Sequence, residues 1–405
     1  MTGPIVEALR RAAGDDHVDQ TSDGLPRATP THTEAAAAVL GTAHQRGWRV
    51  RLEGRGNWMP ADAPADLVVR TTGMSRMTSV SATDLVASVE AGASLSQLGN
   101  RLARHRAWLA VDPPGEGDRS IGSVAATATA GPLRYRYGPI RDHILGCTVV
   151  TGDGRVVRSG GAVVKNVAGY DLTKLHVGGF GAFGLITELH LRLRALPAAD
   201  LTLLATGDRD TLTRTGRDLA AANLDVAALE LLSPPLAASR GWTLAVRFAG
   251  MTSGAEAEVA RAASLGQVSW TRLATDAARS FWQGAAARCA EGAVAVRLGV
   301  LPDGLDELLD LVEQELDLGR VSAGPGRGGL RWSGSARAEA LIRLREQVAV
   351  REIPLTLERA PWAVLRAVGH FGAFREGAGS LTERLRASFD PKRILGAGVD
   401  GNRRT

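Results

Sequence analysis

The sequence has few residues of the kinds that build covalent or metal-bound frameworks. Its 405 residues include two cysteines, Cys147 and Cys289, whereas a disulfide framework or an iron–sulfur cluster needs more thiols. Histidine is also sparse, and beyond residue 190 the sequence has only His370. This argues against a histidine-based metal site in the second half of the chain. We therefore expect no metal centre.

Long apolar runs are also missing. No stretch of about 18 apolar residues occurs, so no membrane-spanning helix is expected. The segment Met1 to Asp16 is polar and lacks the apolar core of a signal peptide. The sequence predicts a cytoplasmic protein, which can lie at the inner face of the membrane through partner proteins.

Lysine appears at three positions only, so arginine supplies nearly all of the positive charge behind the net charge of +5. These arginines form no long run, and such spreading is more typical of a solvated surface than of a nucleic-acid footprint. We expect no nucleic-acid partner.

The first half of the chain predicts short strands and capped helices. Residues 1–24 are polar and are expected to be flexible. Capping boxes at Thr31–Glu34 and Ser94–Gln97 predict helices reaching Gly47 and about Arg106. Strands are expected at Trp48–Leu52, Leu67–Arg70, Leu85–Glu90, Trp108–Val111 and Leu185–Leu193, and a hairpin at Cys147–Ser159.

The second half predicts a smaller α+β domain over residues 201–380. We expect one mostly antiparallel sheet with helices on one face, and a mobile loop at Gly324–Gly329. Strands are expected at Val226–Leu232, Thr243–Phe248, Ala293–Val300 and Ile353–Glu358. Helices are expected from a capping box at Ser253–Glu256 and at Thr275–Cys289, Leu305–Leu316, Ala336–Val348 and Leu381–Ala387.

Three segments rich in small residues could approach a ligand closely. They are Gly54–Trp58, Ser120–Gly131 and Gly178–Gly184. Clustered backbone amides suit a pyrophosphate, and a floor of small residues suits a flat ring system. Taken singly, each segment is as well explained by turns and close packing, and neither the Rossmann spacing nor a Walker A pattern is present.

Several motifs in a fixed order are more specific. They are Ser120-Ile-Gly-Ser, Gly138-Pro-Ile-Arg-Asp142, Gly152-Asp-Gly154, Lys165-Asn-Val-Ala-Gly-Tyr-Asp-Leu172 and Gly184-Leu-Ile-Thr-Glu188. The series resembles the FAD-binding domain of the vanillyl-alcohol oxidase and p-cresol methylhydroxylase (VAO/PCMH) superfamily. The Lys165 motif and the closing Phe389-Asp-Pro-Lys-Arg-Ile-Leu most resemble the FAD-binding E subunits of bacterial glycolate oxidases.

The resemblance implies an α+β fold. A two-lobed FAD-binding domain would span residues 25–200, the smaller domain would follow, and residues 381–405 would return to the FAD domain. It also implies FAD contacts. The pyrophosphate loop would be Gly54, Arg55, Gly56, Asn57 and Trp58; the central wall Ser120, Ile121, Gly122, Thr127, Thr129 and Gly131; and the adenine side Gly178, Gly179, Gly184 and Ile186.

Some side chains keep two interpretations. Arg55 could face the phosphates or lie on the surface. Tyr170 and Asp171 could support the loop against the flavin or serve packing alone, and we favour packing. Lys165 and Asn166 have the same two interpretations. The basic and aromatic cluster Arg134, Tyr135, Arg136, Tyr137 and Arg141 could bind nucleic acid, although a loop beside the flavin or a subunit contact is favoured. Because Gly54–Trp58 contains neither histidine nor cysteine, FAD is expected to be bound non-covalently.

The resemblance implies oxidation of a 2-hydroxy acid such as glycolate or D-lactate. This chemistry needs a base to take the hydroxyl proton and a cation to bind the carboxylate. For the base, the sequence offers His370 as a weak catalytic candidate. For the cation, arginines such as Arg297 and Arg331 are available, but no sequence signal favours any one of them. Electrons would pass to an iron–sulfur subunit in a complex that includes a second flavoprotein subunit. Two alternatives stay open: a free-standing FAD-dependent 2-hydroxy acid dehydrogenase, and an assembly protein that has lost FAD.

Overall fold

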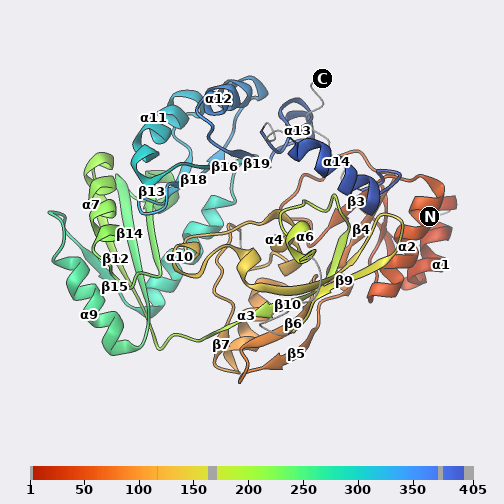
Figure 1. Ribbon diagram of the computed structural model, residues 1–405, viewed down its shortest axis with the longest axis horizontal. Helices are drawn as coiled ribbons and strands as arrows, with labels where there is room; N and C mark the ends of the chain where they lie inside the picture. Colours follow the sequence, from red (N-terminus) through yellow and green to blue (C-terminus); the bar gives the residue numbers. More distant parts are fainter. Residues whose placement is uncertain (1–2, 116, 163–170, 373–376, 396–405) are drawn as a thin grey trace.

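The computed structural model describes residues 3–115, 117–162, 171–372 and 377–395. Figure 1 shows two lobes, with residues 378–395 returning across the first of them. The part of the Lys165 motif from Lys165 to Tyr170 lies outside the described residues. The interpretations of Lys165, Asn166 and Tyr170 therefore stay predictions.

The first lobe begins with a small sheet in the order β1-β2-β4-β3, packed against two helices. Its elements are α1 (Pro4–Ala13), β1 (Val18–Gln20), β2 (Pro26–Ala28), α2 (Thr33–Arg46), β3 (Val50–Glu53) and β4 (Leu67–Arg70). The pairing of β4 with both β2 and β3 is parallel. The predicted flexibility of residues 1–24 is wrong for this stretch, because α1 buries Val6, Leu9 and Ala13 in the cluster that also holds α2.

A second, antiparallel sheet completes the first lobe in the order β5-β6-β10-β8-β9. Its strands are β5 (Met77–Ser81), β6 (Val86–Glu90), β8 (Ile144–Val150), β9 (Val156–Gly160) and β10 (Leu185–Arg192). Beside it lie α3 (Leu95–Ala103), β7 (Ala107–Trp108), α4 (Ile121–Thr127), α5 (Arg134–Tyr137), α6 (Thr173–His176) and β11 (Arg194–Ala195). The predicted hairpin is confirmed as β8–β9.

The second lobe is built on an antiparallel sheet in the order β15-β12-β14-β13-β17-β18-β16-β19. The strands are β12 (Ala199–Gly207), β13 (Ala228–Leu232), β14 (Trp242–Gly250), β15 (Thr271–Leu273), β16 (Val294–Gly299), β17 (Arg320–Ala323), β18 (Gly329–Gly334) and β19 (Leu355–Arg359). The helices are α7 (Arg209–Ala221), α8 (Pro234–Ala237), α9 (Thr252–Ala263), α10 (Thr275–Cys289), α11 (Leu305–Leu316), α12 (Ala338–Val350) and α13 (Trp362–Val368).

Helices cover both faces of this sheet, which corrects the prediction of one covered face. On β12, Leu201 and Leu203 face the cluster that includes α7, α9, α11 and α12. The intervening Thr202 accepts a hydrogen bond from the indole of Trp282 on α10. Alternate residues of a strand point to opposite faces, so α10 covers the other face, toward the first lobe. There the Ala286 carbonyl of α10 accepts the amide of Gly115.

The C-terminal segment packs on the first lobe. Helix α14 (Ala378–Phe389) leads to Leu395, which forms a parallel bridge with Val50 of β3. The buried carboxylate of Asp390 accepts the amides of Ile394 and Leu395 and fixes the turn between them. In Figure 1 this segment, dark blue, lies beside β3 and β4.

Candidate functional site

A pocket lies where the β3–β4 loop, α4 and the start of β10 meet. It encloses about 750 Å³ of empty space, its mouth included. We call it the glycine pocket and define it by its lining: Arg51, Leu52, Glu53, Gly54, Arg55, Gly56, Asn57, Trp58, Met59, Pro60, Thr71, Gly122, Ser123, Ala126, Thr127, Phe180, Gly181, Gly184, Leu185 and Ile186.

Glycines bring these three elements close together. A Cβ on Gly54 would collide with the hydroxyl of Ser120, so glycine lets the end of β3 pack against the start of α4. A Cβ on Gly122 would lie 2.7 Å from the Cβ of Ala91. Gly184 has φ +135°, and a Cβ there would lie 2.5 Å from a methyl group of Val149. The glycines thus shape the pocket by close packing as well as by lining it.

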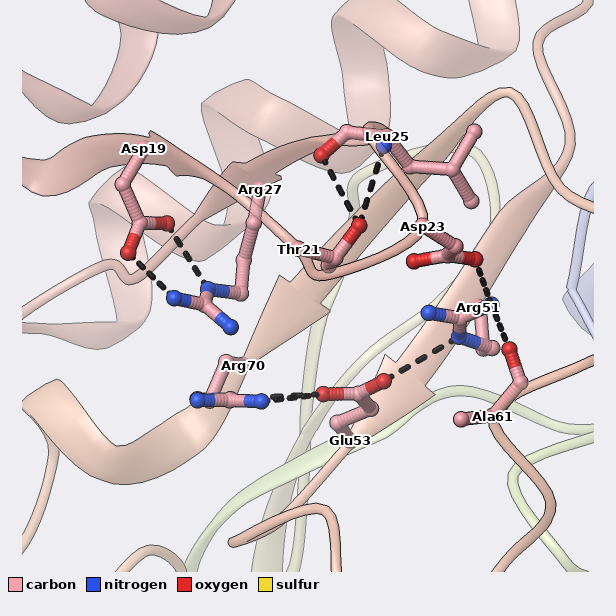
Figure 2. A network of polar contacts seen from close by, with 9 residues as sticks. All are labelled: Asp19, Thr21, Asp23, Leu25, Arg27, Arg51, Glu53, Ala61 and Arg70. Carbon is pink, nitrogen blue, oxygen red and sulfur yellow. Dashed lines mark hydrogen bonds and ion pairs between the residues drawn. The ribbon is translucent and has the colours of Figure 1, made fainter.

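A polar network holds both ends of the β3–β4 loop (Figure 2). Glu53, the last residue of β3, accepts hydrogen bonds from Arg51 and from Arg70 at the end of β4. Arg51 also pairs with Asp23 and donates to the carbonyl of Ala61 within the loop. Arg51 is nearly buried, so its charge-assisted bonds are shielded from solvent and fix the loop in front of the pocket.

Arg55 has an acidic partner in the structure. Its guanidinium donates to Asp118 at 2.6 Å, and Asp118 also accepts from the amide group of Asn57 at 3.2 Å. The loop is therefore tied to the segment that leads into α4. This geometry gives Arg55 a bracing role and does not support its interpretation as a free cation for the phosphates.

Trp58 is held between two arginines from different lobes. The guanidinium of Arg119 lies 3.9 Å from the centroid of the indole ring, and that of Arg359, at the end of β19, lies 4.8 Å from it. Arg119 is buried, donates to Pro114 O and to the hydroxyls of Thr127 and Thr129, and has a pKa lowered to about 9 by burial. Trp58 thus joins the loop to the second lobe.

The glycine pocket offers polar atoms that the protein leaves unpaired. Among the described residues, the buried hydroxyl of Thr71, which lines the pocket, has no hydrogen-bond partner. Buried polar groups are normally paired, so an unpaired hydroxyl here fits a bound polar ligand. Together with the glycine and alanine floor, this lining fits a large ligand that combines a flat ring with polar groups, as FAD does.

A second pocket lies between α5 and the sheet of the second lobe. We call it the arginine pocket; it encloses about 860 Å³ of empty space, its mouth included, and is lined by Ala130, Gly131, Arg134, Tyr135, Arg297, Leu298, Gly299, Ser322, Arg327, Gly329, Leu330 and Arg331. Arg297 donates to Ala128 O at 3.0 Å and Arg331 to Ala130 O at 2.7 Å.

The two pockets share one segment of chain. Thr127 lines the glycine pocket and Ala130 lines the arginine pocket, and three residues of chain span at most about 11 Å. Arg297 and Arg331 of the second lobe therefore donate hydrogen bonds to the segment that connects the two pockets.

The predicted cofactor residues fall into three groups. Gly54, Arg55, Gly56, Asn57, Trp58, Gly122, Thr127, Gly184 and Ile186 line the glycine pocket, and Gly131 lines the arginine pocket. Ser120, Ile121 and Thr129 are buried behind the lining, where the Ser120 hydroxyl caps α4. Gly178 and Gly179 lie outside both linings, in a turn in which the amide of Gly178 donates to Ala125.

Sequence reasoning missed Thr71, Ser123, Phe180 and Gly181. Thr71 directly follows the predicted strand Leu67–Arg70, so its place at a strand end was a usable signal. Phe180 and Gly181 lie inside the predicted Gly178–Gly184 segment, but the approach of Gly181 to Leu52 depends on tertiary packing.

His370, the weak catalytic candidate, is buried. Its Nδ1 lies 2.7 Å from the carbonyl of Leu357, and its ring packs 4.7 Å from that of Phe180, a glycine-pocket residue. Burial lowers the pKa of His370 to about 4. The neutral, enclosed ring of His370 supports the wall of the glycine pocket from behind. His370 lines neither pocket.

The basic and aromatic cluster mostly faces the second lobe. Arg134 and Tyr135 line the arginine pocket, while Arg136 pairs with Asp225 at 2.9 Å. Tyr137 stacks edge-on against Trp108. This placement matches a loop at the lobe interface.

Cys147 and Cys289 are both buried, and burial raises the pKa of each thiol to about 11. Within the described ranges, no group of three or more potential metal ligands lies together. Nor does the described part contain a helix long and apolar enough to cross a membrane.

Comparison with known proteins agrees with this geometry. Residues 27–160 match a family described as "FAD binding domain". The chain is 38% identical over 122 residues to glycolate oxidase subunit GlcE of Escherichia coli, and 27% identical over 255 residues to glycolate oxidase subunit GlcD of Bacillus subtilis. It is 33% identical over 180 residues to a D-lactate dehydrogenase of Archaeoglobus fulgidus. These matches cover 30%, 58% and 44% of this chain.

The chain spans 35%, 54% and 40% of the lengths of these three relatives. Among solved structures, alkyldihydroxyacetonephosphate synthase matches with a TM-score of 0.71 at 13% identity, over 97% of this chain and 85% of that one. The structural match therefore extends the shared fold through both lobes.

The fold is α+β, and residues 27–160, which supply much of the glycine pocket, match an FAD-binding domain. The chain carries the FAD-binding domain shared by these oxidases and dehydrogenases. The predicted α+β fold class and FAD as the cofactor are confirmed.

Proposed function

We propose that this chain is the FAD-binding subunit of a glycolate-oxidase-like complex and takes part in the oxidation of a 2-hydroxy acid. The observation that carries this proposal is the arginine pocket, which adjoins the glycine pocket through residues 127–131. Guanidinium groups bind carboxylates through paired hydrogen bonds, so this pocket suits an organic acid. Similar proteins are named for glycolate, D-lactate and D-2-hydroxyglutarate.

When bound, FAD would supply the two-electron, hydride-accepting chemistry that converts a 2-hydroxy acid into a 2-oxo acid, with loss of the hydroxyl proton. The residues of the glycine pocket would hold FAD, with Gly54–Trp58 on the pyrophosphate. Arg297 and Arg331 would hold the substrate carboxylate at the end of the arginine pocket nearest the shared segment, because their guanidinium groups are anchored to Ala128 and Ala130. Positioning of this kind contributes to the rate by fixing the reacting atoms.

We propose that electrons leave through an iron–sulfur subunit and that a second flavoprotein subunit completes the complex. Two similar proteins are named as subunits of glycolate oxidases, which supports an assembly. Such a complex would be cytoplasmic and could contact the membrane through its partners. The proton acceptor is also expected from a partner, because the described lining of the arginine pocket contains hydroxyl groups and arginines but no histidine or carboxylate.

The test is anaerobic mixing of the FAD-loaded chain with glycolate, D-lactate or D-2-hydroxyglutarate, followed by flavin absorbance. We expect bleaching by at least one acid, and sustained dye reduction only after partner subunits are added. Absence of bleaching by any 2-hydroxy acid, with and without partners, would overturn the proposal. Sustained turnover by the isolated chain would show a free-standing dehydrogenase, and failure to bind FAD would favour the assembly protein.

A further inference from the structure

We infer that the arginine pocket selects a 2-hydroxy acid with a second anionic group, so that the bound ligand carries two negative charges. This inference rests on the proposed function and adds the class of substrate. It follows from the positive charges around the pocket, because buried carboxylates of the protein neutralise only some of the pocket's arginines.

Two of the pocket arginines share one buried carboxylate. Glu358 is fully buried and accepts two hydrogen bonds from Arg331, each 2.9 Å long. Arg297 lies 3.5 Å from the same carboxylate. Coulombic attraction to Arg331 helps to hold the pKa of Glu358 below its usual value, although burial acts in the opposite direction. The single negative charge of Glu358 is thus shared by two positively charged guanidinium groups.

A third arginine is only partly satisfied. Arg327 donates to the fully buried Glu230 at 2.5 Å, and Glu230 also accepts from Ser322. The other guanidinium nitrogens of Arg327, Nε and Nη1, are buried and have no hydrogen-bond partner among the described residues. The Arg327 side chain as a whole is 25% exposed and lines the pocket, so a guanidinium with a single carboxylate partner is available there to an anionic ligand.

The fourth arginine faces the same space from the first lobe. Arg134 lies on α5 at the rim of the pocket, and no acidic partner pairs with it in the described part of the chain. Its pKa is lowered by burial and then by repulsion from Arg327, Arg297 and Arg331, and attraction to Asp142 offsets this only in part. The repulsion means that the four positive charges interact with one another across the pocket.

The charges therefore do not balance. Four guanidinium groups face the pocket, whereas Glu358 and Glu230 supply two negative charges, which leaves an excess of two positive charges. Asp112 lies in a neighbouring cavity behind Gly131, where burial raises its pKa to about 7 and it accepts the amide of Leu133. A ligand with one negative charge would neutralise half of the excess, and a ligand with two would neutralise it all.

The arrangement also separates two places for an anion. Arg297 and Arg331 are anchored beside the segment shared with the glycine pocket, where the reacting carboxylate would lie. Arg327, in the β17–β18 turn, and Arg134, on α5, would receive the second anionic group, a carboxylate. A longer 2-hydroxy acid could reach both places, whereas glycolate and lactate could fill only the first.

The test compares ligands of different charge on the FAD-loaded chain by calorimetry and by anaerobic flavin bleaching. Glycolate and D-lactate represent the monoanions, and D-malate and D-2-hydroxyglutarate the dicarboxylates. Succinate, which has no hydroxyl group to oxidise, reports binding alone. We expect the best dianion to bind at least about tenfold more tightly than either monoanion, because one more charge-assisted pair forms.

Two variants locate the second anion. Arg134→Met and Arg327→Met should each weaken dianion binding about 10- to 100-fold and change monoanion binding by less than about threefold. Arg134 lies at the rim, so its variant stays informative if Arg327→Met, which leaves Glu230 unpaired, does not fold. Arg141→Met is the matched control, because Arg141 is exposed and lies outside the pocket.

The outcomes separate this inference from the proposed function. Equal binding of monoanions and dianions, or an equal loss of both in the variants, would overturn the inference, even if bleaching by glycolate or lactate supported the proposed function. If dianions including succinate bind tightly and the variants weaken them, but no 2-hydroxy acid bleaches the flavin, the charge selection holds and the proposed oxidation fails.

Discussion

The position of Trp58 between two arginines gives a prediction that can be worked out in numbers. The ring is 3% exposed, with Arg119 on one side and Arg359 of the second lobe on another. A desolvated cation–π contact is worth up to about 2 kcal/mol, so the two contacts together contribute at most about 4 kcal/mol. Leucine would keep part of the apolar burial but neither contact.

We therefore expect Trp58→Leu to lower the free energy of unfolding by about 3 kcal/mol, within the range for losing a buried aromatic ring. FAD affinity should fall about tenfold, because Trp58 lines the glycine pocket and a looser loop must be ordered on binding. Urea denaturation measures the first quantity, and titration with FAD followed by flavin fluorescence measures the second.

Trp58→Phe keeps an aromatic face and should lose about half as much stability or less. Trp48→Leu is the matched control for the loss of an indole, because Trp48 is half-buried in the α1–α2 cluster and lines neither pocket. If the leucine and phenylalanine variants of Trp58 were equally stable, the arginines would not be acting through the ring, and the reasoning would be refuted.

Other predictions concern packing, acidity and thiol chemistry. Gly184→Ala should lower the free energy of unfolding by about 3 kcal/mol, because φ is +135° and the new methyl group would meet Val149. Gly99→Ala, in open space on α3, should leave the free energy of unfolding unchanged or raise it. The pKa of His370 is about 4 when folded and near 6.5 when unfolded, so between these pH values the unfolded chain binds the extra proton and stability falls as pH falls. His370→Asn should flatten this pH dependence by up to about 3 kcal/mol and leave flavin reduction within about twofold; an unchanged slope would show that His370 is not the source. Both cysteines should resist thiol reagents until the protein unfolds, and rapid labelling of the native chain would contradict their burial.

Local signals in the sequence predicted much of the fold. The Ser94–Gln97 capping box forms both of its hydrogen bonds, and β4 occupies the predicted residues Leu67–Arg70. The α10 and α11 helices also have the predicted bounds, Thr275–Cys289 and Leu305–Leu316. These elements are set by short-range capping and periodicity, which tertiary contacts did not override.

The errors arose where tertiary packing decided between local choices. Helix α2 begins after His32, and α9 after Met251, so the predicted capping bonds at Thr31 and Ser253 do not form. The Gly324–Gly329 segment, predicted as a loop between two elements, is the turn of the β17–β18 hairpin, with Gly324 and Gly329 joined by a backbone hydrogen bond. Its glycine-rich composition predicts a change of direction but does not distinguish a tight turn from a longer loop, and its mobility stays a prediction.

The site was predictable in part. The Gly54–Trp58 loop lines the glycine pocket beside α4, and its contact with FAD stays a prediction. The role of Arg55 depended on Asp118, some sixty residues away, and gave no local signal. The arginine pocket draws on α5, β16 and β18, so its residues become neighbours only once both lobes fold. Arginines that are far apart in the sequence form no motif.

The most direct measurement is the absorption spectrum of the purified chain, before and after acid precipitation. The glycine pocket predicts a yellow protein with FAD in a stoichiometric amount, and acid should release that FAD into the supernatant because no covalent bond is expected. Trp58→Leu, prepared in parallel, should retain less FAD than the natural chain. A colourless protein that takes up no added FAD would contradict the account, and flavin that stays with the precipitated protein would contradict non-covalent binding.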